Sequence, residues 1–149
     1  MTQTEPAPAP PDDIPVIRTI AMPADTNPAG DIFGGWLMSQ MDLAAGNVAA
    51  LQSRGRRATV AVEAMSFLRP VFVGDEVSLY ARIISTGRSS MRIAVEAWRR
   101  DRCGEASQQV TKAIFTFVAI GADRRPRTLP DHMGLETSPA RSGALAYES

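Results

Sequence analysis

Residues 27–42 read Asn-Pro-Ala-Gly-Asp-Ile-Phe-Gly-Gly-Trp-Leu-Met-Ser-Gln-Met-Asp, a loop that leads through a glycine pair into an apolar helix. Glycines at a helix start, here Gly34 and Gly35, leave the first backbone N–H groups uncovered, and those groups attract negative charge. One carboxylate, Asp42, lies on the otherwise apolar segment, where a charged side chain needs a compensating role. The stretch therefore predicts a site where N–H groups stabilise an oxyanion and a carboxylate activates water.

The helix itself is predicted from apolar residues that recur at steps of three and four, which places them on one helical face. These residues are Phe33, Leu37, Met41, Ala44, Val48 and Leu51. Gly55 is a suitable stop after the last turn. Asp31, just before the helix, is expected to be structural, as a turn residue or a helix N-cap.

Strand patterns surround this helix. One is expected at 14–22, and four more at 57–69, 77–83, 91–97 and 110–120. No helical pattern separates the last four, so they are expected to pair as antiparallel neighbours. The predicted fold class is α+β, with one long central helix wrapped by a curved antiparallel sheet. The sheet edges and outer face need further cover, which predicts at least a dimer.

The length of 149 residues fits a single domain, expected at 14–130. Residues 1–13 alternate Pro and Ala and predict a disordered tail, and residues 131–149 are polar and predict a flexible one. Sixteen basic and sixteen acidic residues give no net charge, which argues against nucleic acid as a partner.

The compartment is predicted from what the sequence lacks. No apolar run is long enough for a membrane span, and the N-terminus has no signal-peptide pattern. The single cysteine, Cys103, excludes an internal disulfide and is expected in a turn. We expect a cytoplasmic protein with no membrane partner.

The chain contains, in this order, the segments 18–23, 25–27, 30–42, 67–70, 73–75, 87–90 and 115–119. Together they resemble one family, the YciA-type acyl-CoA thioesterases of the hot-dog fold, over about residues 16–130. It implies a hot-dog fold and hydrolysis of acyl-CoA to free acid and CoA, without a metal or other cofactor. It also implies homodimers with active sites between subunits, often assembled as a hexameric trimer of dimers.

The functional Asn and Asp of that family correspond here to Asn27 and Asp42. The helix after Asp42 departs from the family pattern at 44–47, so the resemblance does not fix the acyl chain length. Eight helical residues separate Gly34 from Asp42, a distance of about 12 Å at ~1.5 Å rise per residue. One thioester carbonyl cannot meet both within one chain, so the two groups are expected to come from different chains.

In the predicted mechanism, the N–H groups of Gly34 or Gly35 receive the thioester oxygen. Asp42 acts as a general base on water or attacks directly to give an anhydride, and Asn27 orients the water or the carbonyl. Each residue also has a simpler interpretation. Asp42 can be a solvated helix residue, Asn27 can make an Asx-turn, and the glycines can permit close packing.

The predicted CoA contacts lie in two places. Arg88, Ser89 and Ser90 form a turn whose guanidinium and hydroxyls suit phosphate oxygens, with an ordinary polar hairpin as the alternative. Arg69 is a second candidate for a phosphate. The resemblance further implies that the strand edge at 59–63 offers backbone groups to the pantetheine amides. The residues of this edge predicted to contact pantetheine are Thr59, Val60, Ala61 and Val62. Arg54, Arg56 and Arg57 either meet the nucleotide or form a solvated loop.

The residues that the domain lacks argue against triad and zinc chemistry. The only histidine, His132, lies in the predicted tail, so the domain holds no Ser-His-Asp triad, and no Cys/His cluster predicts a zinc site. The main alternative function is a hot-dog module that binds acyl-CoA without chemistry; such a module has no need for Asp42 at the reacting carbon. A hot-dog dehydratase is a third option, and it would normally use a catalytic histidine.

Overall fold

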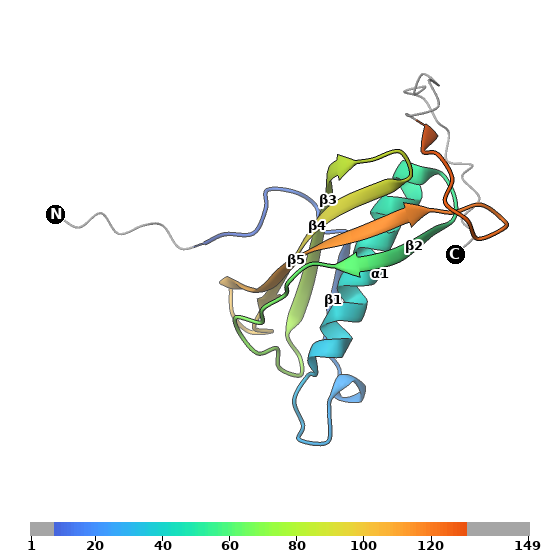
Figure 1. Ribbon diagram of the computed structural model, residues 1–149. Coiled ribbons are helices and arrows are strands. Elements are labelled where there is room, and N and C mark those ends of the chain that lie inside the picture. Colours follow the sequence, from blue (N-terminus) through green and yellow to red (C-terminus); the bar gives the residue numbers. More distant parts are fainter. Residues whose placement is uncertain (1–7, 131–149) are drawn as a thin grey trace.

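The computed structural model describes residues 8–130, which form one long helix and five strands (Figure 1). In chain order the elements are β1 (Ile17–Ile20), the 3-10 turn η1 (Pro23–Asp25), α1 (Gly34–Ser53), β2 (Arg57–Val62), β3 (Glu76–Thr86), β4 (Ser90–Arg100) and β5 (Ser107–Ala119). The predicted order of one strand, one helix and four strands is confirmed. Most of the two predicted tails, with His132, lies outside the described residues.

The five strands form a single antiparallel sheet in the order β1-β3-β4-β5-β2. The sheet curls around α1, which lies along its concave face (Figure 1). The predicted α+β architecture is therefore confirmed. The expected pairing of the four later strands holds for β3, β4 and β5 but is wrong for β2, which crosses the sheet to pair with β5 instead of its chain neighbour β3. β1 and β2 are the two edge strands, so the outer edge of each carries backbone groups that no other strand of the described chain pairs.

Two strands are shorter than predicted. The strand expected at 14–22 is regular only over Ile17–Ile20, and the one expected at 57–69 ends at Val62. Beyond Val62 the chain still follows β5, but through single contacts: Leu68 N–H donates to the Val110 carbonyl at 2.7 Å, and Thr111 Oγ1 donates to the Ser66 carbonyl at 2.7 Å. Apolar composition predicted extended chain there correctly, but it could not predict that the regular ladder stops.

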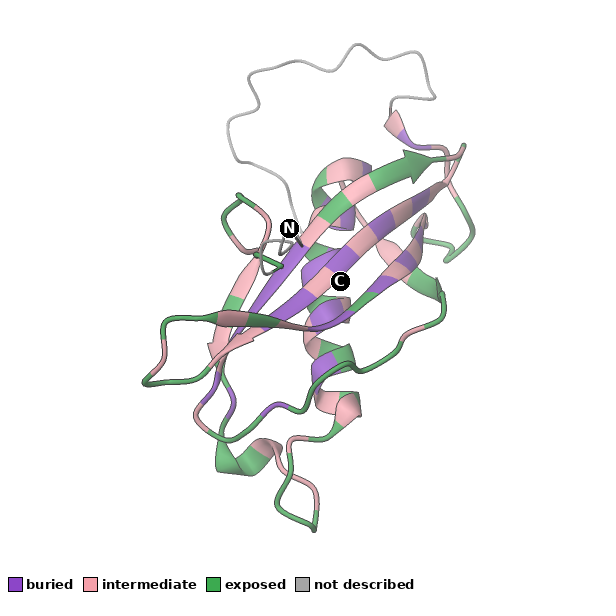
Figure 2. Ribbon diagram, turned by 90° about the vertical axis from the view of Figure 1, so that its left-hand side faces the viewer, coloured by how far each residue is buried: buried purple, intermediate pink, exposed green. Residues whose placement is uncertain are grey.

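The core lies between α1 and the inner face of β3, β4 and β5. Along β4 and most of β5, buried and partly exposed residues alternate (Figure 2). Leu79, Ile93 and Phe115 are inner-face residues, and they are buried together with Leu37 and Met41 of α1. Side chains of alternate residues point to the same face of a strand, so this pattern fixes the register of the sheet against the helix.

The predicted helical stripe is partly wrong. Phe33 precedes the helix and is 42% exposed, and Leu51 is 50% exposed. The helix buries mainly small residues instead, namely Ala44, Ala45, Gly46, Ala49 and Ala50. From Ala44 onward the helix lies so close to the curved sheet that small side chains fill the contact, and the larger Leu43 and Leu51 lie on a side that residues 8–130 do not cover.

The helix ends at Ser53, just before the predicted stop at Gly55. Arg54, not Gly55, takes the left-handed conformation at the C-terminus, with φ of 56°, and its N–H donates to the Ala50 carbonyl. A Cβ at Gly55 would lie 2.8 Å from Arg127 Nη2, so a larger residue there would require the guanidinium of Arg127 to shift.

Candidate active site

Asp42 lies on α1 opposite the edge strand β2. Its Oδ1 accepts a hydrogen bond of 2.6 Å from Thr59 Oγ1. Thr59 is the last residue before a bulge, because the register with β5 shifts between Thr59 and Ala61 and leaves Val60 as an extra residue. A bulge bends a strand and changes the direction of a side chain. Thr59 thus holds the carboxylate of Asp42 at an open sheet edge.

Within the described part of the chain, the carboxylate of Asp42 has no cationic partner. None of the four ion pairs among residues 8–130 includes it, and the Thr59 hydroxyl is its one hydrogen-bond donor in that part of the chain. Since an ionised carboxylate has about four acceptor positions, most of them remain available. The half-buried Asp42 can therefore accept a proton from water or attack an electrophile.

The glycine pair begins the same helix. Phe33, the N-cap residue, contributes no side-chain hydrogen bond. Trp36 N–H donates to the Phe33 carbonyl at 3.1 Å, whereas the N–H groups of Gly34 and Gly35 donate to no acceptor within residues 8–130. Two unpaired donors thus lie at the positive end of the helix dipole, as the sequence predicted.

Close packing also accounts for both glycines. A Cβ at Gly34 would lie 3.2 Å from Phe67 Cζ, and one at Gly35 would lie 3.2 Å from Phe33 Cδ2. The close-packing role that the sequence left open is thus present, and it coexists with the unpaired donors.

Asn27 lies in the loop before α1, and its side chain shapes that loop. Asn27 Oδ1 accepts hydrogen bonds from the N–H groups of Ala29 at 3.0 Å and Asp31 at 3.1 Å, and Gly30 takes a φ of 88°. This is the turn-making role considered for Asn27. Within residues 8–130 its Nδ2 donates to no acceptor, so that amide is free to contact a ligand. Asp31 is a turn residue and not the N-cap.

Within one chain these groups form two separate sets. Asn27, Gly34 and Gly35 lie at the N-terminal end of α1, where the loop projects beyond the sheet (Figure 1). Asp42 and Thr59 lie about 12 Å further along the helix at ~1.5 Å per residue. One thioester carbonyl cannot contact both sets, so a single site requires a second chain.

The two arginines predicted for CoA are far apart. Arg88 lies in the turn between β3 and β4, where Ala119 N–H donates to the Ser89 carbonyl, while Arg69 Nη1 donates to the Gln109 carbonyl. Gln109 and Ala119 are ten residues apart on β5, which is about 33 Å at ~3.3 Å per residue. Arg69 and Arg88 of one chain therefore cannot hold the same diphosphate.

The arginines that follow the helix lie at the same end as Arg88. Arg57 Nε donates to the Gly46 carbonyl at 3.0 Å, and Arg127 Nη2 donates to the Arg56 carbonyl at 3.2 Å. Arg88 Nε donates to Thr128 Oγ1, at 3.2 Å. No carboxylate within residues 8–130 pairs with an arginine at this end, which remains positively charged.

The predicted pantetheine edge is open. Thr59, Val60, Ala61 and Val62 are exposed on the outermost strand of the sheet. The side-chain role of Thr59 was missed by the sequence analysis, which used only its backbone. No local pattern reveals that role, since it depends on the bulge and on the approach of α1.

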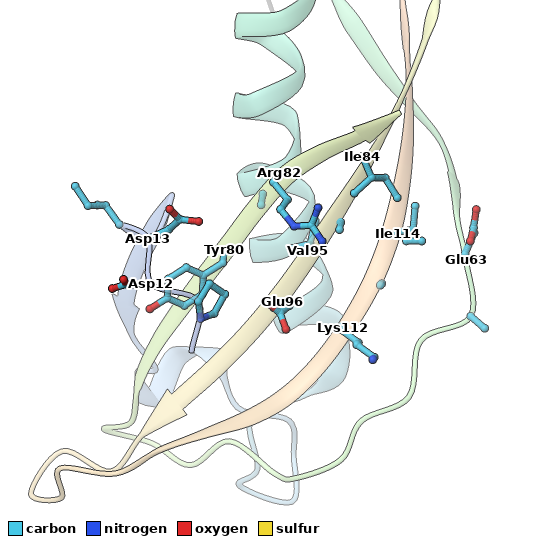
Figure 3. A pocket seen from close by; sticks show the side chains of 16 residues that line it. Asp12, Asp13, Glu63, Tyr80, Arg82, Ile84, Val95, Glu96, Lys112 and Ile114 are labelled. Carbon is cyan, nitrogen blue, oxygen red and sulfur yellow. The ribbon is translucent and has the colours of Figure 1, made fainter. Parts of the chain in front are cut away.

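A cavity of about 940 Å³ lies on the face of the sheet that points away from α1, between the N-terminal segment and the strands (Figure 3). Tyr80, Arg82, Glu96 and Lys112 point into it from β3, β4 and β5. Large pockets are the usual first choice for an active site. Neither Asp42 nor the glycine pair lines this one, so it is not the candidate site.

Among residues 8–130, no group of three or more His, Cys, Asp or Glu side chains is placed to hold a metal ion. The helix of this described part is not apolar enough over its length to cross a membrane.

Comparison with known proteins relates the chain to acyl-CoA thioester hydrolases. An uncharacterised acyl-CoA thioester hydrolase of Zymomonas mobilis is 53% identical over 116 residues, which cover 78% of each chain. The acyl-CoA thioester hydrolase YciA of Escherichia coli K12 is 50% identical over 118 residues, which cover 77% of this chain and 89% of that one.

The solved structures give the same result. A hexameric broad-specificity acyl-coenzyme A thioesterase is 46% identical, with a TM-score of 0.77, and covers 82% of this chain and 84% of that one. A hexameric thioesterase of Yersinia pestis is 51% identical, with a TM-score of 0.76, and covers 80% of this chain and 98% of that one. The predicted resemblance to YciA-type hot-dog proteins is confirmed. Residues 29–104 match the thioesterase superfamily, and this chain belongs to that family.

Proposed function

We propose that this protein hydrolyses the thioester bond of acyl-CoA, giving a free acid and CoA. The observation that carries the proposal is the carboxylate of Asp42, held by Thr59 at 2.6 Å at an open sheet edge, on a helix that begins with two unpaired N–H groups. These are the two elements that thioester hydrolysis needs, a base or nucleophile and an oxyanion site. The names of the relatives point to the same reaction.

The site is composed of two protomers. The N–H groups of Gly34 and Gly35 from one protomer receive the carbonyl oxygen, where negative charge develops. Asp42 of the other protomer takes a proton from water as that water attacks the carbonyl carbon. The tetrahedral intermediate then collapses, the C–S bond breaks, and the CoA thiolate leaves and takes up the proton. The free Nδ2 of Asn27 orients the water or the carbonyl.

A second route uses the same residues. Asp42 attacks the carbonyl carbon directly, the thiolate leaves, and water hydrolyses the resulting anhydride. Both routes need only water and the side chains named, so the reaction requires no metal or prosthetic group.

The protomers assemble at least as a homodimer. The exposed Leu43 and Leu51 of α1 form an apolar surface that a second copy would cover. Since relatives are described as hexameric, we propose a trimer of dimers for this chain as well. The exposed Cys103 thiol suits a reducing compartment, and we place the protein in the cytoplasm.

CoA is bound along the edge of β2 and at the arginine-rich end. The backbone groups of the strand edge Thr59–Val62 meet the pantetheine amides. Arg88, Ser89 and Ser90 meet phosphate oxygens, for which a guanidinium fork and hydroxyl donors are suited. Arg69 has no part in the same phosphate contact unless it comes from a different protomer.

The proposal is tested by measuring thiol release from CoA esters that range from acetyl to palmitoyl. The wild-type protein is expected to release thiol from at least one of them. Binding of these esters without thiol release from any of them would identify a binding module and contradict the hydrolase.

The shared site is tested with two inactive variants, Asp42→Ala and Gly34→Trp, produced together. Random pairing makes half of the dimers mixed, and each mixed dimer has one intact site of two, so roughly a quarter of the wild-type activity should return. If each chain carries its own complete site, the mixture stays inactive at every ratio.

A further inference from the structure

The ring of Phe67 lies directly against the start of α1. A Cβ at Gly34 would be 3.2 Å from Cζ of this ring and 3.4 Å from Cε2. The ring is 47% exposed, so one side contacts the glycine and the other faces outward. Phe67 therefore lies next to the N–H group that is proposed to bind the thioester oxygen.

The backbone on both sides of Phe67 is fixed to β5. The preceding carbonyl, of Ser66, accepts a hydrogen bond from Thr111 Oγ1, and the following N–H, of Leu68, donates to the Val110 carbonyl, both at 2.7 Å. Thr111 and Val110 are fully buried. The backbone that carries the ring is thus anchored to an interior strand of the sheet, and shifting that backbone away from Gly34 would break both hydrogen bonds.

We propose that Phe67 is a specificity-determining residue that restricts the substrate to acyl groups without a branch next to the thioester carbonyl. The inference rests on the proposed function and adds the substrate class. An acyl group whose oxygen is bound at Gly34 has its α-carbon one bond from the carbonyl carbon. A methyl branch on that carbon meets the ring, whereas a straight chain extends past it.

The same ring has an electrostatic effect. An apolar wall beside the N–H pair keeps water away from it, and hydrogen bonds to a developing oxyanion are stronger where water is excluded. Phe33 supplies a similar wall beside Gly35, because its Cδ2 and Cε2 atoms lie 3.2 Å from where a Cβ would be. Replacing Phe67 should therefore weaken turnover of straight chains while it admits branched ones.

The experiment compares butyryl-CoA with isobutyryl-CoA, which have the same number of carbons. We expect the wild type to prefer butyryl-CoA. In Phe67→Ala the ratio of the two kcat/KM values is expected to fall about tenfold, the effect of relieving one methyl-sized contact, and Phe67→Leu should be intermediate. The matched control is Phe72→Ala, because Phe72 is 50% exposed on the same connecting segment but stacks on Arg99 instead of α1.

A ratio within twofold of wild type in both Phe67 variants overturns the inference, as does a wild type that hydrolyses both esters equally. If Phe67→Ala does not fold, Phe67→Leu carries the test. A wild type inactive on both esters overturns the proposed function too, whereas an active wild type with unchanged ratios overturns only the role of Phe67.

A double variant separates packing from chemistry. Gly34→Ala keeps the N–H group but adds a methyl group that meets the Phe67 ring, so it should lose activity. The smaller side chain in Gly34→Ala/Phe67→Leu should restore part of it. Equal activity in the single and double variants would show that the ring does not bound the oxyanion site.

Discussion

Two aspartates of this molecule, Asp75 and Asp42, are held in opposite ways. Asp75, just before β3, is 3% exposed, and its Oδ2 accepts 2.9 Å hydrogen bonds from Arg99 Nη1 and from Phe72 N–H. Asp42 is half-buried and accepts one hydrogen bond from the neutral hydroxyl of Thr59. One carboxylate is fully compensated by a cation and an amide, and the other is positioned but not neutralised.

The difference separates structural from chemical roles. A buried carboxylate is tolerated when a cation and hydrogen bonds replace its lost hydration, and it then serves stability. A carboxylate that must accept a proton or attack a carbonyl loses reactivity when a cation pairs with it. Replacing Asp42 should therefore lower the catalytic rate and leave stability almost unchanged, whereas replacing Asp75 should lower stability and leave the catalytic rate almost unchanged.

The largest effect is expected for Asp42→Ala, which removes the proposed base or nucleophile. Thiol release from acyl-CoA should fall about a thousandfold. The melting temperature and the oligomeric state should stay close to wild type, because no ion pair is lost. Activity within a few-fold of wild type would remove Asp42 from the mechanism.

The opposite result is expected for Asp75→Ala. The variant leaves the partly buried guanidinium of Arg99 without its anionic partner, and the free energy of unfolding should fall by about 3 kcal/mol. Denaturant titration measures this loss. Protein that remains folded should keep most of its kcat, and a specific loss of kcat with unchanged stability would contradict the division between the two aspartates.

A tenfold effect is expected at Thr59. Thr59→Val removes the hydroxyl that holds Asp42 but keeps the shape of the side chain, and kcat should fall roughly tenfold with little change in KM. Thr59→Ser restores the hydroxyl and should recover most of the rate. If Thr59→Ser and Thr59→Val have equally low kcat, the hydrogen bond to Asp42 does not determine the rate.

The smallest effect extends the comparison to a partly exposed carboxylate. The hydrogen bond from Arg100, with the charge of Arg18 in support, lowers the pKa of Glu76 from its ordinary value of 4.5. The ionised form is thus favoured in the folded state, so its stabilisation is present above pH 4.5 and is lost as the pH falls below that value.

Glu76→Gln should remove this part of the acid dependence and cost about 1 kcal/mol or less at neutral pH. Unfolding curves at pH 7 and near pH 4 measure the loss of stability at neutral pH and the change in stability between the two pH values. A variant that loses as much stability between the two pH values as wild type would show that Glu76 does not contribute to the acid sensitivity.

Much of the architecture could be predicted because the determining signals are local. The alternation in residues 77–83 and 91–97 and the glycine pair before an apolar helix predicted the strands and the helix start, but not the pairing of β2 with β5. The separation between Gly34 and Asp42 followed from helix geometry alone. Its consequence, a site shared between chains, stays a prediction until the mixing experiment is done.

The remaining features depend on how distant segments approach one another. Leu51 has the spacing of a core residue, yet the curved sheet leaves no room for it and buries Ala49 and Ala50 instead. Thr59 contacts Asp42 because a bulge turns it there. Arg69 and Arg88 both resemble phosphate ligands, and only the length of β5 shows that one chain cannot use them together.

The arginines gathered near the turn between β3 and β4 have a consequence for the kinetics of encounter. The chain as a whole carries no net charge, so a polyanionic substrate is not drawn to its surface in general. The positive field at this end of the sheet would instead attract the phosphate groups of such a substrate first. The thioester would then reach the helix in a second step. Added salt would then slow capture, seen in kcat/KM, while the turnover of bound substrate stays constant.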